Sequence, residues 1–274
     1  RALFAQLAAS GMAHVAVSPG SRSTPLTVAA DRTPGLEVSI HLDERSAGFF
    51  ALGLARSARR PVALVCTSGS AAANYLPAVV EAFHSGVPLI LLTADRPPEL
   101  QGRGAPQTID QIGLYGTHTR WTANVGTAGS EAPGEAASLA HQAVVRATRQ
   151  APGPVHVNIG LREPLEPPAQ DPPPVGLLPM PPEHATVEPG PLLELLGTER
   201  GLLVTGPMDT DGPGVEAIAE LSRRTGWPIL ADPASGLRRG PHTSQTPVVA
   251  SGDHLLRSTW ADDHRPEVVV QMGA

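Results

Sequence analysis

The chain has 274 residues, a formal net charge of −6 and 41% hydrophobic residues, which is enough for one large or two ordinary globular domains. The acidic balance, the lack of a basic tract and an aromatic content of 3% exclude an ordinary nucleic-acid-binding protein. Its apolar runs are too short to cross a bilayer, so we expect no membrane insertion. The lone Cys66 and the lack of a visible signal peptide predict a cytoplasmic location.

Strand-like apolar runs alternate with helical stretches from the start to about residue 160. The expected strands are residues 14–18, 36–41, 62–67, 88–93 and 155–159. The expected helices are residues 24–31, 44–59, 70–85 and 131–149. Nearly continuous apolar strands separated by helices are typical of a parallel sheet covered on both faces, so we predict an α/β fold.

A proline-rich segment divides the chain. Residues 162–191 contain 11 prolines, which predicts an extended, stiffened linker and not a folded element. Beyond it, expected strands at residues 201–205, 227–231 and 267–271 and an expected helix at residues 214–225 indicate a second α/β unit. The domain boundaries predicted here are residues 1–161 for the first domain and residues 192–274 for the second.

Polar clusters follow four of the expected strands, at residues 18–23, 43–44, 67–70 and 95–96. In parallel sheets ligands bind at the carboxyl ends of the strands. The four clusters therefore predict a binding site along one edge of the first sheet.

Glu44 stands where an expected strand ends and an apolar helix begins. A carboxylate in such a place loses solvent and can share a proton with a partner. The alternative is an acid that caps the helix and is favoured by the helix dipole. His41, Asp43 and Glu44 could together suggest a metal site, but the three side chains would not share one strand face. We predict no metal ligands there.

Two arginines follow strands in the same region. Arg22 lies among hydroxyl residues at a helix start and predicts an anion site, although a plain strand-to-helix turn is the alternative. Arg96 precedes two prolines, which favour an extended backbone before them, so Arg96 is expected to project from the edge of the sheet as a binding residue. The simpler alternative is a surface ion pair between Asp95 and Arg96. We favour carboxylate binding because the guanidinium fork matches a carboxylate.

The segment 67–74 combines small residues with hydroxyls. Such a segment lets a flat ligand approach the backbone, or it is a small-residue helix that packs closely on the sheet. A nucleophile elbow is excluded because no G-x-S-x-G motif occurs.

Together, the segments 18–26, 43–45, 67–71 and 91–100 resemble, in order and spacing, the thiamine-diphosphate-dependent 2-succinyl-5-enolpyruvyl-6-hydroxy-3-cyclohexene-1-carboxylate (SEPHCHC) synthases of menaquinone biosynthesis, the MenD family. The resemblance is strong over residues 1–160 and weaker beyond. It implies a pyrimidine-binding domain at residues 1–161 and a truncated Rossmann-like central domain at residues 192–274. The family's C-terminal domain, which binds the diphosphate and Mg²⁺, is then absent.

The resemblance also assigns roles. Glu44 matches the catalytic glutamate that hydrogen-bonds the aminopyrimidine ring of thiamine diphosphate. Further cofactor-binding positions are Pro19, Thr67, Ser68 and Asn74. The implied substrate-binding positions are Ser21, Arg22, Arg96 and Gln107. Pro106 stands where the family carries Asn.

The implied activity is decarboxylation of 2-oxoglutarate on thiamine diphosphate and addition of the succinyl-semialdehyde carbanion to isochorismate. The family's active sites lie between subunits, which implies a homodimer or tetramer. Residues 1–274 alone are then expected to be inactive. Two alternatives are another thiamine-diphosphate enzyme similar to acetohydroxyacid synthase, and a non-catalytic binding protein that kept the fold. A pyruvate-type site needs fewer cations than Arg22 and Arg96 supply, which disfavours the first.

Overall fold

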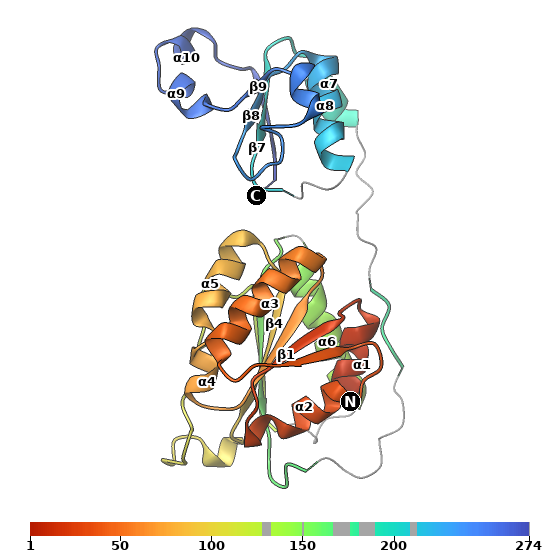
Figure 1. Cartoon of the computed structure of the whole chain (residues 1–274), viewed down its shortest axis with the longest axis vertical. Coiled ribbons are helices and arrows are strands. Elements are labelled where there is room, and N and C mark those ends of the chain that lie inside the picture. Colours follow the sequence, from red (N-terminus) through yellow and green to blue (C-terminus); the bar gives the residue numbers. More distant parts are fainter. Residues whose placement is uncertain (128–132, 150, 167–175, 181–189, 209–212, 274) are drawn as a thin grey trace. The chain divides into compact units, whose positions relative to one another are not determined.

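The computed structural model describes residues 1–127, 133–149, 151–166, 176–180, 190–208 and 213–273. The chain divides into two compact units, Arg1–Glu183 and His184–Ala274, and each has its own parallel sheet (Figure 1). Among the described residues, no helix has both the length and the hydropathy that a bilayer span requires.

The first unit is built on six parallel strands in the order β2-β1-β3-β4-β6-β5. Their bounds are β1 His14–Val17, β2 Glu37–Ile40, β3 Val62–Cys66, β4 Leu89–Asp95, β5 Trp121–Val125 and β6 Val155–Gly160. The predicted parallel α/β sheet is confirmed. Because every strand runs in the same direction, all six carboxyl ends lie along one edge of the sheet.

Helices cover both faces of this sheet. Apolar residues of α1 Ala2–Ala9, α2 Thr24–Asp31 and α6 Pro133–Thr148 form one core with the strands. The second core contains residues of α3 Glu44–Ala58, α4 Ser70–Ala73 and α5 Leu76–Ser85. The central strands β3 and β4 are buried at every position, which explains why they are continuous apolar runs in the sequence.

In the first unit, the structure differs from the predicted elements in three places. The single helix expected at residues 70–85 is two helices, because Pro77 lacks an N–H group and lies in the first turn of α5. Helix α1 and strand β5 were not predicted. β5 pairs only with β6 and alternates between half-buried and exposed residues, so it is an edge strand without a continuous apolar run. Residues 131 and 132 of the expected fourth helix lie outside the described residues.

Part of the proline-rich segment contacts the first unit. Gln6 of α1 donates a hydrogen bond to the Leu178 carbonyl (2.9 Å) and accepts one from the Leu178 amide (2.7 Å). Met180 packs against the core that contains α1. Residues 167–175 and 181–189 lie outside the described residues, and the domain boundaries stay a prediction.

The second unit is also α/β, with strand order β10-β7-β8-β9. Its strands are β7 Gly201–Thr205, β8 Ile229–Ala231, β9 Val248–Val249 and β10 Val268–Met272. Its helices are α7 Gly190–Leu195, α8 Pro213–Thr225, α9 Gly252–Leu256 and α10 Trp260–Asp263. Trp227 is the largest side chain of its core and donates a hydrogen bond to the Thr198 carbonyl. It packs so closely on Gly201 that no side chain fits there.

Candidate functional site

The four polar clusters that the sequence singled out follow β1, β2, β3 and β4. These are neighbouring strands in the order β2-β1-β3-β4. The clusters therefore lie side by side along the carboxyl edge of the sheet, which is where parallel sheets bind ligands.

Glu44 is the first residue of α3, but it does not cap this helix. The N-cap is Asp43, whose Oδ1 accepts a hydrogen bond from the Ser46 amide at 2.7 Å. This hydrogen bond lowers the pKa of Asp43 and keeps it ionised. The Glu44 carboxylate is half-buried and makes no hydrogen bond or ion pair with the described residues. Asp43 is therefore the N-cap, while Glu44 is an acid in the first turn, where the helix dipole favours a negative charge.

Buried groups at the ends of β1 and β3 lie near Glu44. Burial, and next the negative charge of Glu44, raises the pKa of the Cys66 thiol, so this thiol is inert. Tyr75 donates from its hydroxyl to the Val65 carbonyl at 3.1 Å. The Ser18 Oγ atom is buried beside Tyr75 but reaches hydrogen-bond geometry with no described residue. An acid and an unsatisfied hydroxyl thus lie in one region, which suits a ligand with ring nitrogens and an amino group.

The turns after β1 and β3 approach each other closely. A Cβ atom at Gly20 would lie 2.4 Å from the Cβ atom of Thr67. Only glycine therefore fits at position 20, and the two turns form one surface.

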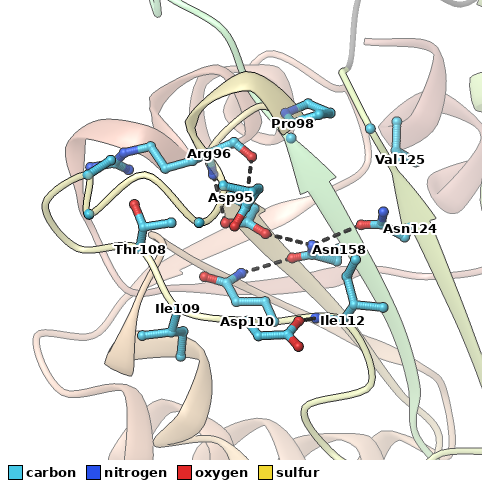
Figure 2. A pocket seen from close by; sticks show the side chains of 17 residues that line it. Asp95, Arg96, Pro98, Thr108, Ile109, Asp110, Ile112, Asn124, Val125 and Asn158 are labelled. Atoms are coloured by element: carbon cyan, nitrogen blue, oxygen red, sulfur yellow. Dashed lines mark hydrogen bonds between the residues drawn. The ribbon is translucent and has the colours of Figure 1, made fainter.

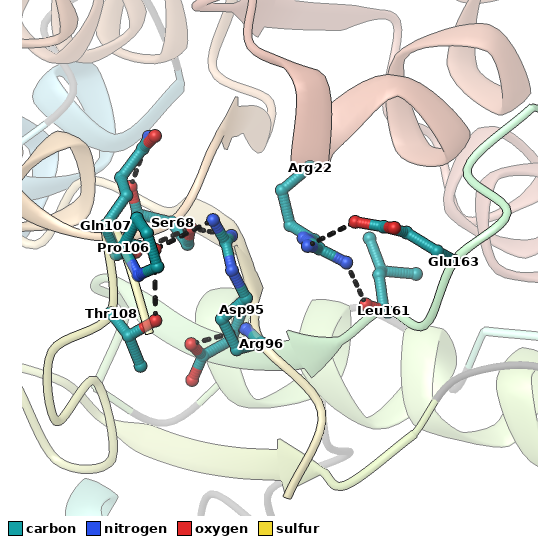
Figure 3. A network of polar contacts seen from close by, with 9 residues as sticks. All are labelled: Arg22, Ser68, Asp95, Arg96, Pro106, Gln107, Thr108, Leu161 and Glu163. Atoms are coloured by element: carbon teal, nitrogen blue, oxygen red, sulfur yellow. Dashed lines mark hydrogen bonds and ion pairs between the residues drawn. The ribbon is translucent and has the colours of Figure 1, made fainter. Parts of the chain in front are cut away.

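A network of polar contacts joins the turn after β3 to the loop after β4 (Figure 3). The Arg96 Nη1 atom donates to Ser68 Oγ at 2.6 Å, and Nη2 donates to the Pro106 carbonyl at 2.9 Å. Ser68 Oγ donates to the Gln107 carbonyl, while Gln107 Nε2 donates to the Ser68 carbonyl. Gln107 has a positive φ of 56°. The structure thus brings Ser68, Arg96 and Gln107 together, and the backbone carbonyl of Pro106 supplies one of the contacts.

Arg22 lies in the short 3₁₀ helix Ser21–Ser23 and is 6% exposed. Its Nη1 donates to the Leu161 carbonyl at 2.8 Å, and its Nη2 pairs with Glu163 Oε1 at 3.0 Å (Figure 3). Its buried Nε has no hydrogen-bond partner among the described residues. Burial first, and then the charge of Arg22, lowers the pKa of Arg96. The two guanidinium groups therefore act on one region of space, as a site for more than one carboxylate requires.

The other predicted site residues lie on the same edge with fewer contacts. Thr67 is buried, whereas Pro19, Ser21 and Asn74 are exposed. Asn74 is the residue that ends α4. Among the residues that the structure describes, no cluster of three or more His, Cys, Asp or Glu side chains could hold a metal ion.

A cavity of about 490 Å³ opens at the carboxyl ends of β4, β5 and β6 (Figure 2). Asp95, Gln111, Asn124 and Asn158 form part of its polar wall. Asp95 is 3% exposed and accepts hydrogen bonds from the Arg96 amide and from Asn158 Nδ2. Asp95 therefore does not form the surface ion pair with Arg96 that was the simpler interpretation of the sequence.

Sequence reasoning missed Gln111, Asn158 and Glu163. A signal for Asn158 was present, because His156 and Asn158 alternate with apolar residues in β6 and so face the same side of the strand. Thr93 Oγ1 contacts both of them, at 2.7 Å and 2.9 Å. Burial lowers the pKa of His156 to about 4, so its imidazole is neutral at pH 7. Two polar residues on one face of a buried strand indicate a buried polar network.

Comparison with known proteins agrees with this geometry. Residues 1–114 match the family described as "Thiamine pyrophosphate enzyme, N-terminal TPP binding domain". The SEPHCHC synthase of Geobacillus kaustophilus is 47% identical, over 100% of this chain and 49% of that protein. The same synthase from Haloquadratum walsbyi is 44% identical, over 100% of this chain and 47% of that protein. By sequence, the chain is similar to these synthases along its whole length. It spans about half the length of the curated relatives it matches.

A solved structure supports the fold. Benzoylformate decarboxylase from Polynucleobacter necessarius matches with a TM-score of 0.67 and 20% identity, over 85% of this chain and 43% of that chain. At this identity the match shows the fold of the chain and nothing about its substrate.

Proposed function

We propose that the full-length protein is a SEPHCHC synthase, which decarboxylates 2-oxoglutarate on thiamine diphosphate and adds the resulting succinyl unit to isochorismate. The sequence similarity to curated synthases extends over the whole chain. The observation that carries the proposal is the pair of guanidinium groups, Arg22 and Arg96, at the carboxyl edge of the sheet. Both proposed substrates carry several carboxylates, which arginine binds through its fork.

The residues near Glu44 fit the pyrimidine part of the cofactor. Glu44 makes no hydrogen bond or ion pair with the described residues, and the buried Ser18 hydroxyl has no hydrogen-bond partner among them. Glu44 would donate or share a proton with the ring nitrogen, while the turn that contains Thr67 and Ser68 and the nearby Pro19 and Asn74 would bound the ring. Bound thiamine diphosphate would supply a nucleophilic carbon. We assign Mg²⁺ and the diphosphate to a part of the protein beyond these residues.

Arg22 and Arg96 would orient the substrates, with Ser21 and Gln107 beside them. In the structure Glu163 places a carboxylate on the Arg22 fork at 3.0 Å, and its side chain is 72% exposed. An exposed carboxylate on a buried guanidinium can leave when a substrate carboxylate arrives. Glu163 therefore acts as a stand-in for the substrate in this proposal.

We also propose a cytoplasmic homo-oligomer with active sites between subunits. The support is a group of exposed apolar side chains before and within α3, the helix that begins with Glu44: Ile40, Leu42, Phe49 and Phe50. Contiguous exposed apolar side chains mark protein–protein contacts. A second subunit on this surface would remove solvent from Glu44.

The test is an assay of the full-length protein with thiamine diphosphate and Mg²⁺. We expect CO₂ release from 2-oxoglutarate and a new product only when isochorismate is present. CO₂ release from pyruvate in place of 2-oxoglutarate would support the acetohydroxyacid-synthase-like alternative. Absence of turnover with either acid, in a protein that binds the cofactor, would contradict the proposed function.

A further inference from the structure

Two buried amide side chains, those of Gln111 and Asn158, join the turn after β3 to the end of β4. The Gln111 Oε1 atom accepts a hydrogen bond from the Gly69 amide at 2.8 Å. Its Nε2 atom donates to the Ala94 carbonyl at 3.2 Å and to Asn158 Oδ1 at 2.8 Å. Gln111 is 1% exposed and Asn158 is 2% exposed. These hydrogen bonds therefore do not compete with bulk water.

Asn158 continues the connection to Arg96. Its Nδ2 atom donates to Asp95 Oδ2 at 2.8 Å and to Asn124 Oδ1 at 2.9 Å. Asp95 Oδ1 accepts from the Arg96 amide at 2.7 Å. Because Thr93 Oγ1 also donates to Asn158 Oδ1, all four hydrogen-bonding positions of the Asn158 amide are filled.

The hydrogen bonds of this network have only one consistent direction. The Gly69 N–H group can only donate, so the oxygen of Gln111 must face it and the nitrogen must face Asn158. The oxygen of Asn158 then faces Gln111, and its nitrogen faces Asp95. The network ends on a carboxylate, which accepts at every oxygen when ionised. A change at either amide therefore disturbs the other.

We propose that Gln111 and Asn158 are positioning residues, which hold the Arg96 backbone and the Ser68–Gly69 turn in one relative geometry for carboxylate substrates. The inference rests on the proposed synthase function. The Arg96 guanidinium contacts Ser68 Oγ at 2.6 Å, so side chain and backbone of Arg96 are both tied to the same turn. A forked contact with a carboxylate depends on guanidinium orientation, and a small misplacement costs much of the rate.

Two variants of the full-length protein test this proposal. Gln111→Met keeps the approximate size of the side chain but removes its hydrogen bonds. Asn158→Asp is isosteric but turns an oxygen toward Asp95. Each variant should raise KM for the carboxylate substrates on the order of tenfold to a hundredfold, with a smaller change in kcat. An unchanged KM in both folded variants would overturn the proposal.

Gln6→Met is the matched control for buried amide loss. Gln6 is 0% exposed, and both ends of its amide bond the Leu178 backbone. Gln6→Met and Gln111→Met should both lower Tm, but only Gln111→Met should raise KM. An equal rise in KM in both variants would show a structural role alone and overturn the proposal.

A double-mutant cycle tests whether Gln111 acts through Arg96. In an Arg96→Ala background, Gln111→Met should raise KM little further, because the group that it positions is gone. Fully additive effects of the two substitutions on KM would overturn this step.

A second measurement needs no activity, so it separates this proposal from the proposed function. Hydrogen exchange at the Gly69 and Arg96 amides should become faster in both variants, because the network couples its two ends. If each variant lost protection at only one of these two amides, the one nearer in space to the substituted side chain, the proposal would be overturned. If the wild-type protein shows no turnover, the proposed function fails, and this exchange pattern alone decides the positioning role.

Discussion

At the scale of single residues, the site depends on which charged groups have a protein partner. Asp43 and Glu44 are neighbours in the sequence, yet Asp43 caps α3 and Glu44 makes no hydrogen bond or ion pair with a described residue. Arg22 is buried and Arg96 is half-buried, whereas Arg162 pairs with Glu99 on the exposed surface. Burial of the two arginines and the lack of a partner for Glu44, and not charge alone, distinguish the charged candidate site residues.

Glu44→Gln should slow proton exchange at the reactive carbon of bound thiamine diphosphate by about 10²–10⁴-fold, because an amide cannot relay the proton. The measurement is hydrogen–deuterium exchange at that carbon in the full-length protein. Asp43→Ala is the control, since it removes the helix cap and should lower Tm while leaving the exchange rate near the wild-type value. A wild-type exchange rate in Glu44→Gln would contradict the assignment.

Arg22→Ala and Arg96→Ala should each lower kcat/KM for the carboxylate substrates by tenfold or more, since a hydrogen bond to a charged group contributes about 1.5–3 kcal/mol. Affinity for thiamine diphosphate, measured by calorimetry, should change little. Arg162→Ala serves as control, because an exposed ion pair contributes little. A selective loss of cofactor affinity in either site variant would contradict the proposal that these arginines bind the substrate carboxylates.

At the scale of elements, the site depends on how closely the turns after the strands approach each other. The turn after β3 places Gly69 at a φ of 84°, which a residue with a side chain rarely adopts. A Cβ atom there would lie 2.9 Å from the Gln107 Cγ atom. The backbone of this turn and the position of Gln107 therefore depend on each other.

Gly69→Ala should lower the free energy of unfolding by about 1–3 kcal/mol through backbone strain, and it should displace Gln107. Gly53→Ala is the matched control, because Gly53 is exposed within α3 and no atom lies within 4 Å of its built Cβ. That change should raise stability by about 0.5–1 kcal/mol. Urea unfolding measures both variants, and stability changes of the same sign would contradict the proposed strain.

At the scale of the whole molecule, the proposed function assigns only part of the cofactor site to the described residues. In that proposal they supply the pyrimidine-binding region and two arginines, while the chain spans about half the length of its curated relatives. A diphosphate group carries most of the cofactor's charge and normally needs a metal ion to offset it. The described residues contain no cluster suited to a metal ion.

Residues 1–274 expressed alone should therefore bind thiamine diphosphate weakly, gain no affinity from Mg²⁺ and release no CO₂ from 2-oxoglutarate. Calorimetric titration and a CO₂-release assay measure these properties, with circular dichroism to confirm folding. The full-length protein is the positive control. Tight, magnesium-dependent binding by residues 1–274 would instead place a diphosphate site within them.

The sequence by itself determined the type and order of most elements of both sheets. β3 and the first four residues of β4 are buried on both faces, and that burial is visible as unbroken runs of apolar residues. The sequence also placed the four polar clusters on one edge, because a strand followed by a helix in a parallel sheet always ends on the same side. Edge strand β5 and the break before α5 were missed, since local packing decides them.

Only the tertiary structure decided which polar groups meet. Gln111 lies in a loop and Asn158 in β6, and their contact with each other and with Gly69 depends on strands that are distant in sequence but adjacent in the sheet. It also decided that Asp43, and not Glu44, caps α3. The physical reason is that a hydrogen bond requires donor and acceptor within about 3 Å, and residue type and spacing along the chain do not specify distances of that kind.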